Sequence, residues 1–446
     1  MDNLLIKNAK IVNEGIIKEC DIYIEGETIK QIGNSINVNL EKTKVIDALG
    51  NYVIPGVIDD QVHFREPGLT HKADIESESR AAIAGGITSY IEMPNTNPQT
   101  TTIEKLNEKF EIASKKSFAN YSFMFGGTND NLEEILKVNT QEVAGLKLFL
   151  GSSTGNMLVD NPEILEKIFS STDMIISVHC EDEETIRKNT EIYVDKYGDD
   201  IPIKFHPIIR SEEACYLSSS KAIELAKKTG ARLHVFHLST GKETHLFSND
   251  IPLKDKKITA EVCIHHLWFS DADYEEKGTR IKWNPAVKTA SDRDELWKAL
   301  LDDRIDVIAT DHAPHTVDEK NNPYTKAPSG GPLVQHALVA MFEAYHQGKI
   351  SIEKLVEKMC HNPAILFQVE KRGFIKEGYF ADMVIVDINN PWTVQPDNIL
   401  YKCGWSPFEG ATFKSKIAQT VLNGKVVYNN NKVSDIKSAK RLTFNR

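Results

Sequence analysis

The middle of the chain alternates short apolar segments with helix-like segments, and this alternation constrains the fold more than any other feature of the sequence. Eight apolar segments are typical of strands, because they are short, rich in β-branched residues and bounded by turn residues. This order predicts an α/β fold, a (β/α)₈ TIM barrel with functional groups at the carboxyl ends of its strands. The predicted strands are 57–64, 87–94, 120–126, 143–150, 174–180, 232–238, 257–263 and 306–312.

Helical periodicity occupies most of the intervals between these strands, and a further helical segment follows the eighth. A doubly wound open sheet is the alternative fold, but no glycine-rich phosphate-binding motif follows the first predicted strand. The barrel is therefore the better prediction. The predicted helices are 76–85, 102–116, 131–138, 162–170, 211–230, 292–303 and 332–348.

Both ends of the chain have a different pattern, in which apolar and polar residues alternate between glycine and asparagine turns. This alternation is typical of antiparallel strands. Near the C-terminus, Asn423-Gly424 lies between two such segments and predicts a two-residue hairpin turn. We therefore expect a small composite β-sandwich formed by 1–54 and 366–446, beside a barrel formed by 55–365.

Composition excludes several classes of partner. With 53 basic and 64 acidic residues, the 446-residue chain has a formal net charge of −11, which argues against nucleic acid or an anionic membrane as partner. No apolar run is long enough to span a membrane, and the first ten residues lack the apolar core of a signal peptide. The six cysteines form no Cys-x-x-Cys pair, which disfavours a disulfide framework. We expect a soluble, cytoplasmic protein.

Candidate metal ligands recur near the carboxyl ends of the predicted strands. A single histidine is more often a structural residue, but its repetition at the same end of several barrel strands favours a metal site. Imidazole and carboxylate donors without thiolates suit Zn²⁺, with Mn²⁺, Fe²⁺ or Co²⁺ possible. The candidates are Gln61 and His63, which share a strand face, and Lys147, His179, His237 and Asp311.

Lys147 lies in an apolar run, where a buried ammonium is costly unless it is paired or neutralised. A lysine that extends its amine to a strand edge is the simpler alternative. A lowered pKa would make the amine nucleophilic, and reaction with CO₂ would give a carbamate that bridges two metals. Asp311, in the segment IATDHAPH, is either a turn residue or a carboxylate that ligates a metal and transfers a proton.

Several motifs in order along the whole chain resemble those of the dihydroorotases, in the cyclic amidohydrolase superfamily. They are VIDDQVHFREPGLTHK, EMPNTNP, GLKLF, VHCED, HVFHLST, KWNP, ATDHAPH and GYFADMVIVD. The motifs HFREPG and MPNTNP distinguish dihydroorotases from two related families. Allantoinases typically have Asn at the position of Arg65, and hydantoinases lack both motifs.

The resemblance implies a binuclear zinc centre and a substrate pocket. One zinc would be held by His63 and Asp311, the other by His179 and His237, with carbamylated Lys147 as the bridge. The substrate carboxylate would be held by Arg65, Asn95 and His315, because Arg suits bidentate carboxylate recognition. Asn284 and the loop around Gly330 would contact the pyrimidine ring.

Gln61 departs from the His-x-His pair that dihydroorotases typically carry on the first strand. A glutamine oxygen is a weaker zinc ligand than imidazole. Three outcomes follow: a binuclear site in which Gln61 contributes little, a mononuclear enzyme, or an inactive homologue. The presence of the other site residues argues against the last.

The implied reaction is the reversible cyclisation of N-carbamoyl-L-aspartate to L-dihydroorotate in de novo pyrimidine biosynthesis. It would use a metal-activated hydroxide, with Asp311 as acid and base. An allantoinase or another cyclic-ureide hydrolase is one alternative, and a non-catalytic partner of aspartate transcarbamoylase is another. We also expect a homodimer or higher homo-oligomer.

Overall fold

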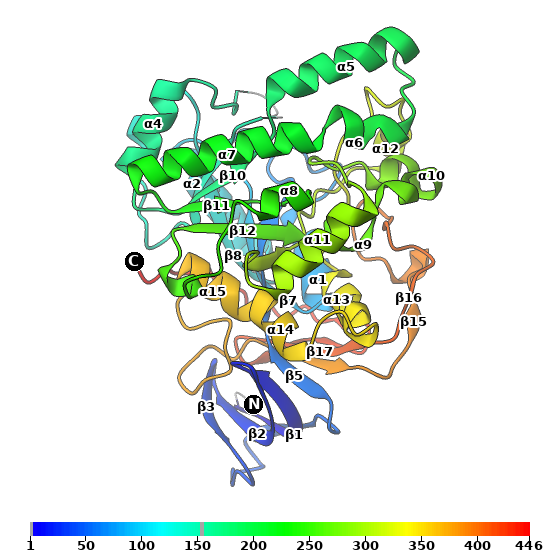
Figure 1. Ribbon diagram of the computed structural model, residues 1–446. Helices are drawn as coiled ribbons and strands as arrows, with labels where there is room; N and C mark the ends of the chain where they lie inside the picture. Colours follow the sequence, from blue (N-terminus) through cyan, green and yellow to red (C-terminus); the bar gives the residue numbers. More distant parts are fainter. Residues whose placement is uncertain (1–2, 152–155) are drawn as a thin grey trace.

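The core of the fold is a barrel of parallel strands, shown in the computed structural model of Figure 1, which describes residues 3–151 and 156–446. Within these residues eight parallel strands pair in chain order from β6 to β13. A parallel bridge between Val62 and His312 joins the first strand to the segment after the last. The predicted barrel is therefore confirmed. Its strands are β6 (Val57–Val62), β7 (Ile87–Glu92), β8 (Asn120–Gly126), β9 (Gly145–Phe149), β10 (Ile176–His179), β11 (Leu233–Val235), β12 (Ile258–Cys263) and β13 (Val307–Ala309).

Each observed strand lies inside the segment predicted for it, and almost all of its residues are buried. Burial on both faces explains the continuous apolar runs in the sequence, because helices cover the outside of a parallel barrel. The observed strands are shorter than the predicted ones since the last residues of several segments leave the sheet and line the loops above it.

The seven predicted helices are present, with ends displaced by a few residues. Five of the seven begin at side-chain caps such as Asp74, whose carboxylate accepts from the backbone N–H of Ser77. No helix in the described ranges is both long and apolar enough to cross a membrane. The helices matching predictions are α1 (Ile75–Ala84), α2 (Ile103–Lys116), α3 (Leu132–Ile135), α4 (Pro162–Ser171), α7 (Glu212–Thr229), α11 (Ala290–Leu301) and α13 (Ala337–His346).

Helix α5 (Glu183–Tyr197) was not predicted from the sequence. Only Ile186 is buried among its residues, whereas Ile192 is exposed, so the helix has no continuous apolar stripe to signal it. It extends along the outer end of the barrel in Figure 1. The shorter α-helices are α6 (His206–Ile209), α8 (Gly241–Thr244), α9 (Ile264–Trp268), α10 (Tyr274–Lys277), α12 (Val317–Lys320), α14 (Ile352–Val356) and α15 (Asn362–Phe367).

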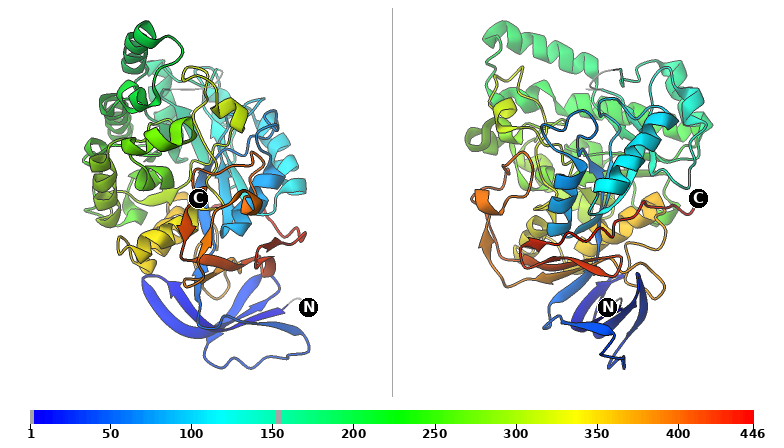
Figure 2. Two further views of the ribbon diagram at one scale, coloured as in Figure 1. Left: turned by 90° about the vertical axis from the view of Figure 1, so that its right-hand side faces the viewer. Right: turned by 180° about the vertical axis from the view of Figure 1, so that it is seen from behind.

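Strands from both ends of the chain form a second, mixed sheet next to the barrel (Figures 1 and 2). Among the described residues it has nine strands, in the order β19-β18-β17-β14-β5-β1-β2-β3, with β4 also paired to β1. The N-terminal strands are β1 (Asn3–Asn13), β2 (Ile16–Glu25), β3 (Thr28–Gly33), β4 (Thr43–Asp47) and β5 (Tyr52–Pro55). The C-terminal ones are β14 (Met383–Asp387), β17 (Lys416–Leu422), β18 (Lys425–Asn429) and β19 (Lys432–Val433).

The pairing of β5 with β14 joins the two ends of the chain, as the sequence patterns indicated. The boundaries 1–54, 55–365 and 366–446 stay predictions. A separate small ribbon pairs β15 (Trp392–Thr393) with β16 (Thr412–Phe413). The predicted Asn423-Gly424 turn connects β17 and β18, and both residues have positive φ, at 46° and 74°. That combination is the one that a two-residue hairpin turn requires.

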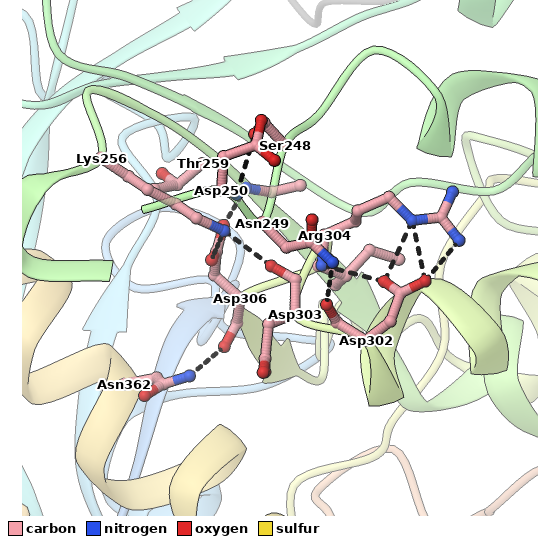
Figure 3. A network of polar contacts seen from close by, with 12 residues as sticks. Ser248, Asn249, Asp250, Lys256, Thr259, Asp302, Asp303, Arg304, Asp306 and Asn362 are labelled. Atoms are coloured by element: carbon pink, nitrogen blue, oxygen red, sulfur yellow. Dashed lines mark hydrogen bonds and ion pairs between the residues drawn. The ribbon is translucent and has the colours of Figure 1, made fainter. Parts of the chain in front are cut away.

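A network of polar contacts lies at the amino ends of β12 and β13, away from the strand ends that carry the candidate site (Figure 3). Lys256, just before β12, is 2.7 Å from a carboxylate oxygen of Asp306, just before β13. The backbone carbonyl of Asp306 accepts from Asn362 of α15 at 2.7 Å. These contacts connect two strands and a helix at the end of the barrel where contacts serve stability.

Candidate functional site

A cavity of about 700 Å³ opens at the carboxyl ends of the barrel strands. Every candidate residue named from the sequence lines it, so the structure brings the whole predicted set together. Their roles stay predictions. These residues are Gln61, His63, Arg65, Asn95, Lys147, His179, His237, Asn284, Asp311, His315 and Gly330.

Strand geometry positions these side chains. Gln61, Lys147 and His179 lie on strands, whereas His237 and Asp311 lie two residues beyond the ends of β11 and β13. The last two have left-handed backbones, with φ of 40° and 46°. Such a conformation costs a non-glycine residue roughly 1 kcal/mol or more, and the surrounding fold must supply it. The strained backbone accompanies two candidate side chains that line the cavity.

His63 is fixed in one tautomer by Asn95. Its Nδ1 lies 2.9 Å from Oδ1 of Asn95, an acceptor, so Nδ1 carries the proton and donates it. Nε2 then directs its lone pair toward Oδ1 of Asp311, 3.2 Å away. Burial lowers the pKa of His63, which favours the neutral ring. A cation between the two electron-rich atoms would stabilise this arrangement, so the pair fits a metal ion.

His179 and His237 form a second pair of donors. Nε2 of His179 donates to Oε2 of Glu181 at 3.0 Å, and Arg210 lies 3.1 Å from the same oxygen. Although burial opposes it, Arg210 and His179 lower the pKa of Glu181, so this carboxylate stays ionised. Nδ1 of His179 is therefore left facing Nε2 of His237, at 3.0 Å. Burial lowers the pKa of both imidazoles, which leaves neutral rings suited to a metal.

Sequence reasoning did not single out Glu181 and Arg210. The sequence did contain a signal for Glu181, because this residue lies in the motif VHCED, two residues after His179. In metal sites, a carboxylate commonly accepts a hydrogen bond from the ring nitrogen of a histidine that does not bind the metal, and this bond orients the ring. Arg210 precedes α7 and comes close only through the fold.

Lys147 is buried in the floor of the cavity, with 1% of its surface exposed. Among the described residues its Nζ has no hydrogen-bond partner, and it lies 4.2 and 4.9 Å from the ring centroids of Phe236 and Phe149. Burial lowers the pKa of the amine to about 7. Much of the amine is therefore neutral at physiological pH, which is the form that reacts as a nucleophile.

Gln61 is also buried and lines the cavity. Its Oε1 accepts from the thiol of Cys263 at 3.6 Å. The oxygen that would ligate a metal therefore already has a protein partner, and the ligand role of Gln61 stays a prediction.

A group of positive charges lines the side of the cavity. Arg65 places Nη2 3.0 Å from Nε2 of His315, and Lys72 places Nζ 3.0 Å from Nδ1 of the same ring. Burial lowers the pKa of Arg65 to about 10, so the guanidinium remains charged at neutral pH. Burial and the neighbouring Arg65 lower the pKa of His315 well below its usual value, so the imidazole is neutral. Glu319, 3.3 Å from Lys72, is the nearby counter-charge.

Lys72 was not named as a site residue from the sequence, although it ends the quoted motif VIDDQVHFREPGLTHK. Arg65 and Lys72 place two positive charges on the cavity wall; Glu319 pairs with Lys72, and Asp311 is the carboxylate that acts most strongly on Arg65. Such a wall suits a small anion, and the planar Arg65 suits a carboxylate in particular.

Asn284 and Gly330 also line the cavity, and Gly330 lies next to His315. Oδ1 of Asn284 is buried and has no hydrogen-bond partner among the described residues, so it is available to a ligand. Gly330 has φ of 126°, and a Cβ there would lie 2.4 Å from the carbonyl oxygen of Ala313. Only glycine fits this close approach of two loops.

Comparison with known proteins gives a consistent result. The model of the amidohydrolase family matches residues 52–427. A dihydroorotase from Staphylococcus epidermidis (strain RP62A) is 33% identical over 435 residues, covering 96% of this chain and 100% of that protein. A dihydroorotase from Carboxydothermus hydrogenoformans is 36% identical over 434 residues, covering 95% of this chain and 98% of that protein.

Solved structures resemble the chain over its whole length. The L-hydantoinase (dihydropyrimidinase) from Arthrobacter aurescens has a TM-score of 0.93 at 27% identity, covering 99% of this chain and all of that one. The D-hydantoinase from Thermus sp. has a TM-score of 0.90 at 24% identity, which shows a shared fold alone. Both likenesses extend over the barrel and the terminal sheet.

Proposed function

Because this chain belongs to the amidohydrolase family and aligns over nearly its whole length with dihydroorotases, we propose that it acts as a dihydroorotase. The reaction is the reversible cyclisation of N-carbamoyl-L-aspartate to L-dihydroorotate, in de novo pyrimidine biosynthesis. The observation that carries this proposal within the site is the pair Arg65 and Lys72, which places fixed positive charge on the wall of a cavity that also contains paired metal-type donors.

Arg65 binds the carboxylate that both substrate and product carry. Its Nε donates to the carbonyl of Pro314 at 3.2 Å, which fixes the plane of the guanidinium. A fixed guanidinium plane matches a carboxylate in a bidentate geometry. Asn95 and His315 complete this subsite, and Asn284 and the Gly330 loop contact the ring.

Metal ions are typical of the amidohydrolase family, and the donor set suits Zn²⁺. His63 and Asp311 would hold one ion and His179 and His237 the other, with a carbamate on Lys147 shared between them. Bound zinc supplies Lewis acidity, which polarises the amide carbonyl and lowers the pKa of water. Carbamylation forms an N–C bond between the neutral Lys147 amine and CO₂ and releases one proton to solvent.

Asp311 transfers the proton. In ring opening its carboxylate accepts a proton from the attacking water and delivers it to the ring nitrogen that leaves the carbonyl carbon. In ring closure it first takes the proton from the ureido nitrogen of carbamoyl aspartate. The left-handed backbone of Asp311 supports this role because it fixes the carboxylate at the cavity, against His63.

An allantoinase or another cyclic-ureide hydrolase remains the second candidate, since an L-hydantoinase structure resembles the chain at 27% identity. A non-catalytic partner of aspartate transcarbamoylase is the third, and homo-oligomerisation stays a prediction. The test is turnover of purified, zinc-loaded protein with dihydroorotate, allantoin and hydantoin side by side. We expect turnover of dihydroorotate alone, and a marked rise in its KM for Arg65→Ala. Preferred turnover of allantoin or hydantoin would contradict the proposal, and so would a zinc-loaded protein without turnover.

A further inference from the structure

Three buried polar side chains meet inside the barrel, beneath the cavity. Asp60 comes from β6, His234 from β11 and Glu261 from β12, and none of their surface is exposed. None of them lines the cavity. Asp60 precedes Gln61, and His234 lies three residues before His237, so the cluster lies on the amino-end side of the site already described.

The donor atoms of this cluster are spaced for a shared ion. Nε2 of His234 lies 3.4 Å from Oδ2 of Asp60 and 3.7 Å from Oε2 of Glu261. One donor atom from each residue lies within 4.8 Å of the other two. Ligands 2.0–2.2 Å from a tetrahedral metal are roughly 3.4 Å apart. Among the described residues, both oxygens of Asp60, Nε2 of His234 and Oε2 of Glu261 have no hydrogen-bond partner.

The hydrogen bonds around His234 fix its tautomer. The hydroxyl of Thr259 donates its single proton to the carbonyl of Leu233 at 3.2 Å. The same hydroxyl must then accept from Nδ1 of His234, 2.9 Å away. Nδ1 is protonated, and Nε2 faces two carboxylates, so Nε2 must hold either a second proton or a metal ion. Although burial lowers the pKa of His234, Asp60 and Glu261 raise it to about 9, so a metal ion would take the place of that proton.

We propose that Asp60, His234 and Glu261 bind a divalent transition-metal ion, zinc or manganese, at a site separate from the one in the cavity. One imidazole and two carboxylates are donors suited to these ions, and their two negative charges balance one divalent cation. Protons are the competing occupants, one on Nε2 of His234 and one on Glu261, whose pKa is raised to about 8 by burial and by Asp60; a divalent ion would replace both.

The ion connects three strands beneath the cavity, and through Glu261 it also supports the backbone of His237, which lines the cavity. The other oxygen of Glu261, Oε1, accepts from the backbone N–H of His237 at 3.2 Å. His237 has the left-handed φ of 40° described above. Fixing Glu261 therefore supports the backbone that presents the His237 ring to the cavity.

Metal content of the full-length protein tests this site without any use of activity. The background is His63→Ala with His179→Ala, which removes one donor from each pair in the cavity. After dialysis against a chelator, we expect one metal ion per protein chain, measured by inductively coupled plasma mass spectrometry. Adding Asp60→Asn should remove that ion. The matched control is Asp59→Asn, the neighbouring buried carboxylate, which bonds to Thr310 instead and should leave the ion in place.

Wild-type crystals supply a second measurement that does not depend on any variant folding. Anomalous scattering at the zinc and manganese edges should give a peak between His234 and Glu261. The absence of that peak would overturn the proposal, as would equal metal content with and without Asp60→Asn. A ¹⁵N NMR signal of a doubly protonated His234 ring would show that a proton, and no metal ion, lies between the side chains.

Discussion

The Nε2 atom of His63 lies 3.2 Å from Oδ1 of Asp311, although the two residues are separated by most of the barrel sequence. They follow the first and the last barrel strands, which meet where the barrel closes. The contact therefore depends on closure of the whole barrel, because its two residues come from opposite ends of the barrel sheet. In the proposed function this pair binds one metal ion, and Asp311 also transfers the proton.

Replacement of Asp311 by Asn keeps its shape and removes its ability to hold a proton. We expect Asp311→Asn to lose roughly 10²–10⁴-fold in kcat, the range of a general acid–base contribution. Binding of dihydroorotate to the zinc-loaded variant, measured by calorimetry, should change little. A large loss of binding would contradict the separation of this role from that of Arg65.

Lys72 should act in substrate binding. Its Nζ lies 3.0 Å from His315, and loss of one charge-assisted contact costs about 1.5–3 kcal/mol. We expect Lys72→Met to raise KM roughly tenfold with a small change in kcat. Lys188→Met is the matched control, because that lysine forms an exposed pair on α5. Equal effects of both variants would rule out a specific role.

Carbamylation of Lys147 should depend on pH in a defined direction. Burial lowers its pKa to about 7, so the amine is protonated below this pH and neutral above it. Starting from metal-free protein, uptake of CO₂ with zinc should increase as pH rises through about 7 and then level off. The measurement is recovered activity against pH at fixed bicarbonate and zinc. Lys147→Met should recover none, and an unmodified lysine in the mass of the native zinc-loaded protein would contradict the carbamate.

Replacement of Gln61 by His tests the weakest candidate ligand. Its Oε1 already accepts from Cys263, whereas an imidazole is a stronger zinc donor. We expect Gln61→His to retain more zinc than the wild type during dialysis against a chelator. Unchanged retention would indicate that position 61 does not limit metal loading.

The buried pair at the amino ends of the strands should matter for stability alone. Lys256 and Asp306 are 5% and 3% exposed, and removing one partner of a buried ion pair typically costs about 3–5 kcal/mol. We expect Asp306→Asn to lower the thermal midpoint, with kcat per folded molecule unchanged. Lys326→Met, which breaks an exposed pair with Asp199, should have little effect on the midpoint.

The barrel and its cavity were predictable because their signal is repetitive. Eight apolar segments identify the strands, and parallel closure brings their carboxyl ends to one rim, so residues such as His179 and His237 meet without any further information. Lys72 and Glu181 carried a signal in the same motifs. Helix α5 did not, because it buries only Ile186.

The cluster beneath the cavity was not predictable from alternation. In a regular strand, Asp60 and Gln61 point to opposite faces. The pairing of β6 with β7 shifts register between Asp59 and Val62, so both side chains face the barrel interior or the cavity. An irregularity of this kind depends on the neighbouring strand, and no periodicity in the sequence records it.

The terminal sheet has a consequence for how the protein is made. Strand β5 pairs with β1 on one side and with β14 on the other, where Pro55 faces Met383, so roughly 330 residues must be synthesised after β5 before the strand on that second side exists. Throughout that interval the ribosome-bound chain carries an unpaired apolar edge, of the kind that invites aggregation. Productive folding in the cell therefore depends on protecting this edge until the last strands emerge.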